Sequence, residues 1–204
     1  MSADVVVIDN YDSFTYNLVD YLGEHVETMV VPNDVDIAQI VDLDPDGIVI
    51  SPGPGHPANT RDVGVVPELL LRMSQTVPTF GVCLGLEIVV HTFGGRIGPA
   101  PRPVHGEATT IAHDGQGVYR DLPETFSAGR YHSLIPLELS DDLIATAWSD
   151  TDDGRLIMGV RHRELPIECV LFHPESVLTP IGRALMANVA SMFEPTKPQA
   201  EVRP

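Results

Sequence analysis

The chain has 204 residues and a formal net charge of −17, from 29 acidic and 12 basic side chains. An acidic chain without a run of Lys or Arg is not expected to bind nucleic acid. Its two cysteines cannot form a disulfide framework. No apolar run approaches the roughly 18 residues of a membrane-spanning helix, so we expect no membrane association. These properties favour an acidic α/β protein of the cytoplasm.

The acidic charge has two explanations. Eleven of the 12 basic residues are Arg, and only Lys197 is Lys. A GC-rich genome combined with a solubilising surface would produce this bias. Adaptation to high salt would also produce it, because dense counterions screen the repulsion between acidic side chains.

Short apolar runs alternate with helical patterns through the first half of the chain. The run at residues 4–8 is typical of a strand buried on both faces, and Asp12 or Ser13 can cap the helix that follows and ends at Gly23. This alternation predicts a mostly parallel, doubly wound sheet with helices on both faces. Further strands are expected at residues 26–31, 47–50 and 77–82, and further helices at residues 37–41, 63–73 and 84–93.

The second half of the chain has a different pattern. Residues 104–172 contain several strand-like stretches separated by polar turns such as Asp114-Gly115. This pattern predicts antiparallel strands added to the sheet. Thr179-Pro180 then opens a last helix. We expect a single domain over residues 1–193 and a flexible tail over residues 194–204.

The segment Gly81-Val82-Cys83-Leu84-Gly85 follows an apolar strand and precedes a helix. This is the context of a nucleophile elbow, with Cys where hydrolases have Ser. The tight turn would expose the Cys83 side chain, and the helix N-terminus favours its thiolate. We therefore interpret Cys83 as a nucleophile, although a buried structural cysteine is the commoner case. Cys169 lies in an apolar run without neighbouring glycines and is expected in the core.

A cysteine nucleophile needs a base, and the base needs a group that orients it. His173 ends an apolar run, and in an extended chain Glu175 projects to the same side. A carboxylate there would fix the imidazole tautomer and stabilise the imidazolium. A loop histidine beside a surface acid is the alternative, and the separate elbow favours the catalytic interpretation.

The loop Ser51-Pro52-Gly53-Pro54-Gly55 follows the third expected strand. It lacks the Gly-Lys-Ser/Thr ending of a phosphate-binding loop, and its prolines remove N–H donors. A rigid turn that exposes one or two backbone amides is better suited to an oxyanion. A plain strand-to-helix turn is the alternative.

Together these motifs resemble those of the class I (Cys-His-Glu) glutamine amidotransferases. The opening segment Ile8–Asn17 is similar to a narrower group, the glutaminase subunits of anthranilate synthase and aminodeoxychorismate synthase. Val104-His105-Gly106 and Arg130-Tyr131-His132-Ser133-Leu134 fit the same group. The resemblance extends over residues 4–193, nearly the whole chain.

The resemblance implies that Cys83 attacks the side-chain amide of L-glutamine, while His173, held by Glu175, relays protons. Backbone N–H groups of Gly53 and Leu84 would hold the oxyanion. The ammonia would pass to a larger chorismate-binding synthase subunit, and no metal or other cofactor is required. We favour the anthranilate branch (tryptophan) over the aminobenzoate branch (folate). The residues expected to bind glutamine are Gly53, Pro54, Gly55, Glu87, Ser133 and Leu134.

Glu87 departs from the family pattern Cys-Leu-Gly-His-Gln, because the last two residues here are Leu86 and Glu87. The usual Gln contacts bound glutamine in relatives, and Glu loses both N–H donors. We expect Glu87 to accept a hydrogen bond from the substrate ammonium. Two other functions are open: a non-catalytic glutaminase-like partner, and another thiol hydrolase such as a cysteine peptidase. The intact Cys83 and His173 argue against the first, and the loop at residues 51–55 argues against the second.

Overall fold

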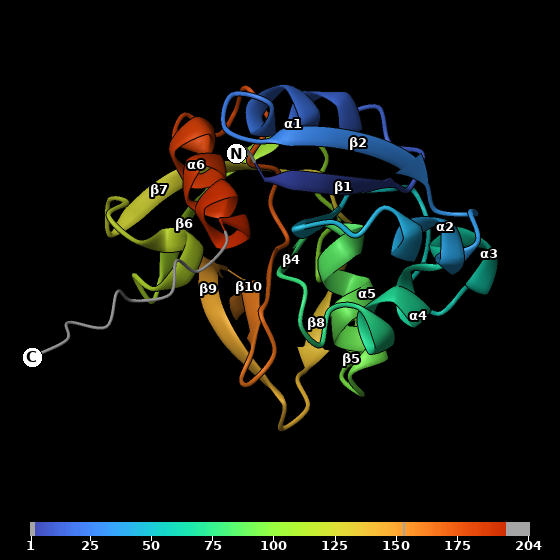
Figure 1. The fold of residues 1–204 in the computed structure, drawn as a ribbon. Helices are drawn as coiled ribbons and strands as arrows, with labels where there is room; N and C mark the ends of the chain where they lie inside the picture. The colour runs from blue at the N-terminus through green and yellow to red at the C-terminus, as the bar shows by residue number, and fades with distance from the viewer. Residues whose placement is uncertain (1–2, 153, 195–204) are drawn as a thin grey trace, which may run out of the picture.

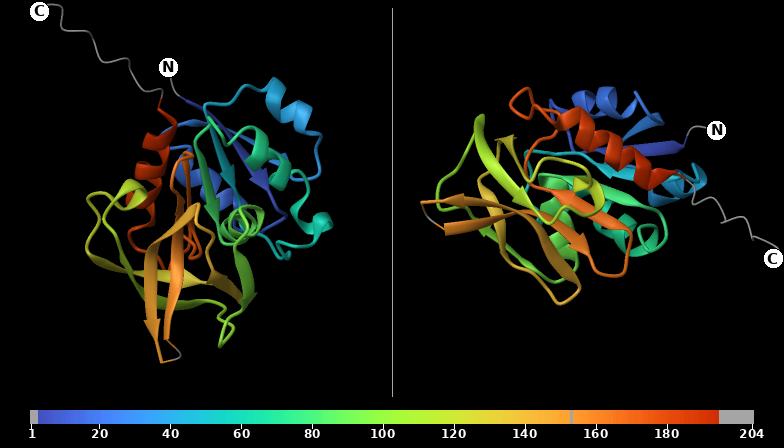
Figure 2. Two further views of the ribbon diagram at one scale, coloured as in Figure 1. Left: turned by 90° about the horizontal axis from the view of Figure 1, so that it is seen from below. Right: turned by 90° about the vertical axis from the view of Figure 1, so that its left-hand side faces the viewer.

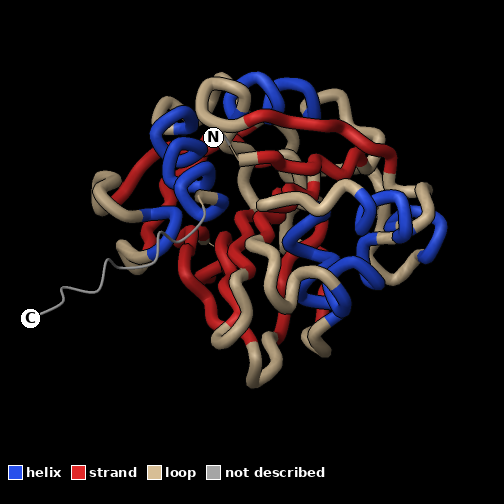
Figure 3. Tube along the Cα trace, in the orientation of Figure 1, coloured by secondary structure: helices blue, strands red, loops and turns tan. Residues whose placement is uncertain are grey.

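The structure is a computed structural model that describes residues 3–152 and 154–194. Its main sheet begins with parallel strands, and Figure 3 shows the strands running through the middle of the molecule with helices on either side. The expected tail, apart from Glu194, lies outside the described residues. The parallel strands, in their order across the sheet, are β2 (Glu27–Pro32), β1 (Asp4–Asp9), β3 (Gly47–Ile50), β4 (Thr79–Val82) and β11 (Ile167–Val170).

Antiparallel strands continue the sheet beyond β11, which confirms the prediction for the second half of the chain. In Figure 2 the paired strands at residues 143–151 and 154–162 extend away from the helices. The added strands are β10 (Gly154–His162), β9 (Leu143–Thr151), β6 (Glu107–His113) and β7 (Thr125–Arg130), and a separate antiparallel pair consists of β5 (Arg96–Pro99) and β8 (Leu134–Glu138).

Helices cover both faces of the parallel half, as predicted for a doubly wound sheet. Helices α1 (Thr15–Leu22) and α6 (Gly182–Phe193) contact each other on one face, and α4 (Val66–Arg72) and α5 (Leu84–Thr92) contact each other on the opposite face (Figure 1). The shorter helical segments are α2 (Ile37–Asp42), α3 (Thr60–Val63) and a 3₁₀ turn at Gly117–Tyr119.

The core follows from the apolar runs of the sequence. Every residue of β3, β4 and β11 is buried. A parallel strand covered on both faces needs a continuous apolar run, which explains the absence of alternation in these segments. Each fully buried Val, Ile or Phe side chain contributes roughly 1.5–3 kcal/mol to folding.

Two local predictions for the first half are wrong. The expected helix over residues 63–73 is interrupted at Gly64, whose φ is +51°, because the N–H of Val65 donates to the carbonyl of Asn33 (2.8 Å) instead of continuing a helix. Neither Asp12 nor Ser13 is the N-cap of α1. That position belongs to Phe14, which has no capping side chain.

Within residues 3–152 and 154–194, no helix combines the length and the apolar character needed to cross a membrane.

The excess of acidic over basic residues leads to a prediction about salt. Ion pairs such as Arg72–Glu68 and Arg102–Glu107 have both side chains at least half exposed and contribute little to stability. The net charge of −17 therefore makes repulsion the dominant surface term. We expect the melting temperature to rise by at least about 3 °C between 0.1 M and 2 M KCl, measured by circular dichroism.

A charge-reduced variant is the control for this prediction. Asp42, Asp121 and Asp141 are all exposed, and changing the three to Asn removes three negative charges. The variant should gain less from salt than the original chain. A melting temperature that is independent of KCl would leave genome composition as the explanation of the charge.

Candidate active site

The predicted site segments all follow the carboxyl ends of neighbouring parallel strands. Asn10 follows β1, the loop at residues 51–55 follows β3, Cys83 follows β4 and His173 lies shortly after β11. These four strands are adjacent in the sheet, and the strand order changes direction at β1. Loops at such a switch point form the usual ligand site of an open α/β sheet. The topology therefore gathers the predicted site residues at one edge.

Cys83 lies in a strained turn between β4 and α5. Its φ of 53° and ψ of −105° are rare for a residue with a side chain and cost about 1–3 kcal/mol. The two glycines of the motif make the turn possible, because a Cβ on Gly81 would lie 2.9 Å from the carbonyl carbon of Gly85, and a Cβ on Gly85 would lie 2.7 Å from the Ile50 oxygen. The predicted strand–turn–helix geometry of a nucleophile elbow is confirmed.

The Cys83 side chain is not exposed, which corrects the expectation from the sequence. Only 6% of the residue is accessible. The loop at residues 51–55 packs on the turn, since a Cβ on Gly53 would lie 2.8 Å from Leu84 Cδ2. Burial raises the pKa of the Cys83 thiol, and the neighbouring His173 imidazole acts in the opposite direction. Cys169 is a core residue, as predicted, and burial raises its pKa without help from an imidazole.

Glu175 reaches His173 as predicted, with 2.6 Å between Nδ1 of the imidazole and Oε1 of the carboxylate. The local backbone is different from the expected extended chain. It forms a turn, in which the N–H of Ser176 donates to the His173 carbonyl (3.2 Å). Burial would lower the pKa of His173, but the Cys83 thiol and the Glu175 carboxylate outweigh it and hold the pKa well above its ordinary value.

The other imidazole nitrogen of His173 faces the nucleophile. Nε2 is buried and has no hydrogen-bond partner among the described residues. Cys83 and His173 shift each other's pKa, so the thiol and the imidazole are close to each other. Because Nδ1 is bonded to Glu175, Nε2 is the nitrogen available to exchange a proton with the thiol.

Aromatic rings fix the position of the His173 imidazole. Phe14 and Tyr131 meet it edge to face, with centroids 5.6 Å and 4.9 Å from its centroid. Thr179 donates from Oγ1 to the His173 carbonyl (2.6 Å). The sequence did not indicate that Phe14 and Thr179 hold His173 in position. Phe14 lies inside the segment Ile8–Asn17 that carries the resemblance, which was the available signal.

The loop at residues 51–55 is anchored to the end of β1. Asn10, which is 2% exposed, donates from Nδ2 to the Ser51 carbonyl and from its backbone N–H to Ser51 Oγ, both at 2.8 Å. In the described part of the chain, the backbone N–H groups of Gly53 and Leu84 donate no hydrogen bond. Two free amides beside Cys83 have the chemistry required to stabilise an oxyanion.

The expected glutamine-binding residues lie at different depths. Pro54 and Ser133 are exposed, Gly53, Gly55 and Leu134 are half-buried, and Glu87 is buried. Ser133 and Leu134 come shortly after Tyr131, whose ring contacts His173. The roles of Ser133 and Leu134 in glutamine binding stay a prediction.

Glu87 lies one turn after Cys83 on α5 and is only 4% exposed. Burial raises its pKa from 4.5 to about 8, so the side chain is mostly protonated near neutral pH. The ionised carboxylate expected from the sequence is therefore not the resting form. A protonated Glu has one O–H donor and one carbonyl acceptor, which partly reproduces the amide of the usual Gln.

Among residues 3–152 and 154–194, no group of three or more His, Cys, Asp or Glu side chains is arranged to hold a metal ion. The absence of a cofactor stays a prediction.

Comparisons with known proteins agree with this geometry. The family model described as glutamine amidotransferase class-I matches residues 6–192. Anthranilate synthase component II of Haloarcula marismortui is 54% identical over 185 residues, which cover 90% of this chain and 89% of the relative. Anthranilate synthase component 2 of Thermus thermophilus is 46% identical over 186 residues, which cover 90% of each chain.

A solved structure has the same fold. The crystal structure of a putative GMP synthase subunit from Thermoplasma acidophilum aligns with a TM-score of 0.85 and 26% sequence identity. The alignment covers 95% of this chain and 94% of the other. The predicted fold class is therefore confirmed over nearly the full length.

Proposed function

Because the chain belongs to the class I glutamine amidotransferase family, we propose that it hydrolyses L-glutamine and supplies the ammonia for anthranilate synthesis, a step of tryptophan biosynthesis. The observation that carries this proposal is the name shared by the similar relatives, anthranilate synthase component II or 2. The names component II and component 2 indicate one subunit of an enzyme that has at least one other subunit. The recipient of the ammonia would be a chorismate-binding subunit.

The first half-reaction uses the buried thiol. Cys83 Sγ attacks the side-chain carbonyl carbon of glutamine, and its proton moves to Nε2 of His173. The carbonyl oxygen becomes an oxyanion that accepts from the backbone N–H groups of Gly53 and Leu84. His173 gives the proton to the amide nitrogen, the C–N bond breaks, and ammonia leaves behind a glutamyl thioester.

The second half-reaction restores the enzyme. His173 takes a proton from water, and the resulting hydroxide attacks the thioester carbonyl. The C–S bond then breaks, His173 returns the proton to sulfur, and glutamate is released. Throughout, Glu175 fixes the imidazole through Nδ1, which keeps Nε2 directed at the reacting atoms.

Exposed apolar side chains near the site support the presence of a partner subunit. Tyr11, Tyr16 and Val177 are large apolar residues that are 60%, 67% and 91% exposed. Val177 borders a hollow of about 350 Å³ between α1 and the loop after His173. Phe14, Tyr131, Glu175 and Ser176 also line this hollow, so a partner bound there would lie directly over the His173–Glu175 pair.

The test is the transfer of labelled nitrogen. Glutamine with ¹⁵N in the side-chain amide, chorismate and a candidate chorismate-binding subunit are mixed with the chain, and the products are analysed by mass spectrometry. We expect ¹⁵N-anthranilate and an equal amount of glutamate. Labelled aminodeoxychorismate would indicate the folate branch instead, and no release of glutamate would favour a non-catalytic partner. The cytoplasmic location stays a prediction.

A further inference from the structure

Arg130, the last residue of β7, is a buried cation without an acidic partner. The residue is 4% exposed. The only hydrogen bond of its side chain within the described residues runs from Nε to Nε2 of His132 (3.0 Å). His132 is neutral, because burial lowers its pKa to about 4 and its Nδ1 donates to the Leu134 carbonyl. Burial and the neighbouring Arg102 lower the pKa of Arg130. An anion bound at the guanidinium would offset both effects.

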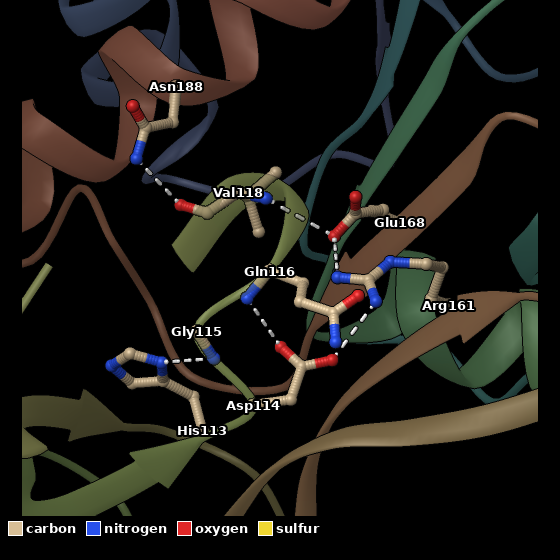
Figure 4. A network of polar contacts seen from close by, with 8 residues as sticks. All are labelled: His113, Asp114, Gly115, Gln116, Val118, Arg161, Glu168 and Asn188. Atoms are coloured by element: carbon tan, nitrogen blue, oxygen red, sulfur yellow. Dashed lines mark hydrogen bonds and ion pairs between the residues drawn. The ribbon is translucent and has the colours of Figure 1, made fainter. Parts of the chain in front are cut away.

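Arg161, another largely buried arginine of this chain, is neutralised by acidic side chains of the protein. Arg161 forms ion pairs with Asp114 (3.0 Å) and Glu168 (3.1 Å), as Figure 4 shows. Glu168 also accepts a hydrogen bond from the Val118 backbone N–H. The charge of Arg161 is therefore satisfied by groups of the protein itself. Arg130 has no equivalent pair in the described part of the chain.

The acid opposite Arg130 in the sheet is already paired with another arginine. Glu107 lies directly opposite Arg130 in the β6–β7 ladder. Its two carboxylate oxygens instead accept from Arg102, at 2.7 Å and 3.4 Å. The terminal nitrogens of the Arg130 guanidinium therefore have no hydrogen-bond partner within the described residues, and they are available to a ligand.

Arg130 lines a cavity of about 480 Å³ between the segment at residues 101–109 and the β9–β10 turn. Neither Cys83 nor His173 lines this cavity, so the site does not depend on the proposed glutaminase activity. Two acids, Asp150 near the end of β9 and Asp152 at the turn, also line it. Asp150 pairs with Arg155 (3.7 Å), whereas Asp152 has no ion pair within the described residues.

The charges that remain unpaired in the cavity are thus one cation at its base and one anion at its exposed edge. We propose that this cavity binds an α-amino acid, with the ligand carboxylate on the Arg130 guanidinium and the ligand ammonium on Asp152. The planar guanidinium matches a carboxylate in a bidentate pair. The cavity lining carries three acids and two bases in all. Its net negative charge disfavours multiply charged anions such as phosphate, which is why a zwitterion fits better.

The test is a titration of the whole chain with the L-amino acids other than glutamine, glutamate and asparagine, which could enter the glutamine site. Isothermal titration calorimetry should detect binding of at least one amino acid at one site per chain. Acetate and methylammonium, each carrying half of the zwitterion, should bind at least about tenfold more weakly.

Variants locate the binding. Arg130→Lys keeps the charge but loses the bidentate geometry, and Asp152→Asn changes an exposed turn residue that does not support the core. Each should weaken binding about tenfold or more, while the exposed control Arg96→Gln should not. No binding by any amino acid at about 10 mM, equal binding of acetate, or unchanged affinity in both variants would overturn the proposal.

Discussion

Replacing Cys83 with Ser is expected to reduce glutamine-dependent synthesis by the assembled enzyme by about three orders of magnitude or more. A hydroxyl has no accessible anion near neutral pH, and it cannot replace the thiol as nucleophile at the elbow. Synthesis from added ammonium should continue, because the chorismate-binding subunit would then receive ammonia from solution. Parallel assays with glutamine and with ammonium chloride measure both rates.

Cys169→Ala is the matched control for this substitution. Cys169 is 1% exposed inside β11, and it lies beside the turn without forming part of it. The variant should keep glutamine-dependent activity even if it loses some stability through a small cavity. Loss of activity in Cys169→Ala with full activity in Cys83→Ser would reverse the roles assigned to the two cysteines.

Replacing Glu87 with Gln is expected to stabilise the protein increasingly as the pH rises. The folded-state pKa is about 8 and the ordinary value is 4.5, so the folded protein keeps a proton that the unfolded chain releases. The stability contributed by protonated Glu87 is fully present below pH 4.5 and is lost as the pH rises to about 8. Gln does not titrate, so the variant should avoid this loss.

The expected size is a relative gain of roughly 1.4 kcal/mol per pH unit at most, reaching several kcal/mol near pH 8 and constant above it. Urea unfolding curves of both proteins from pH 5 to pH 9 measure this difference. Glu124→Gln, at an exposed loop position, is the control and should show no such slope. A gain for Glu87→Gln that does not change with pH would contradict the assigned burial of a titrating carboxyl group.

The fold could be predicted well from local patterns. Continuous apolar runs at β1, β3 and β4, separated by helical periodicity, require a covered parallel sheet, and the structure has one. The break at Gly64 could not be predicted, because it depends on a backbone contact with Asn33, which is distant in sequence. Periodicity reports which residues face the core, but it does not report where a helix loses its hydrogen bonds to a neighbouring loop.

The site was predictable as a set of residues but not as an environment. The glycines around Cys83 identify the turn, because a Cβ on Gly81 would collide with Gly85, and a Cβ on Gly85 would collide with Ile50. The burial of the thiol and the raised pKa of Glu87 depend on which loops pack over the turn, and this information is tertiary. For the same reason, the sequence could not predict that Arg130 lacks an acidic partner. The sequence places Glu107 and Arg102 nearby but does not say which arginine binds the acid.

In the proposed mechanism, Cys83 Sγ is the atom that attacks glutamine. The most direct measurement is covalent labelling by a glutamine analogue that has a chloroketone in place of the side-chain amide, followed by peptide mass spectrometry. We expect one adduct per chain, located on Cys83. Its formation should be slowed by excess glutamine, and it should be absent from Cys83→Ser. An adduct on Cys169, or labelling of Cys83 that glutamine does not slow, would contradict this mechanism.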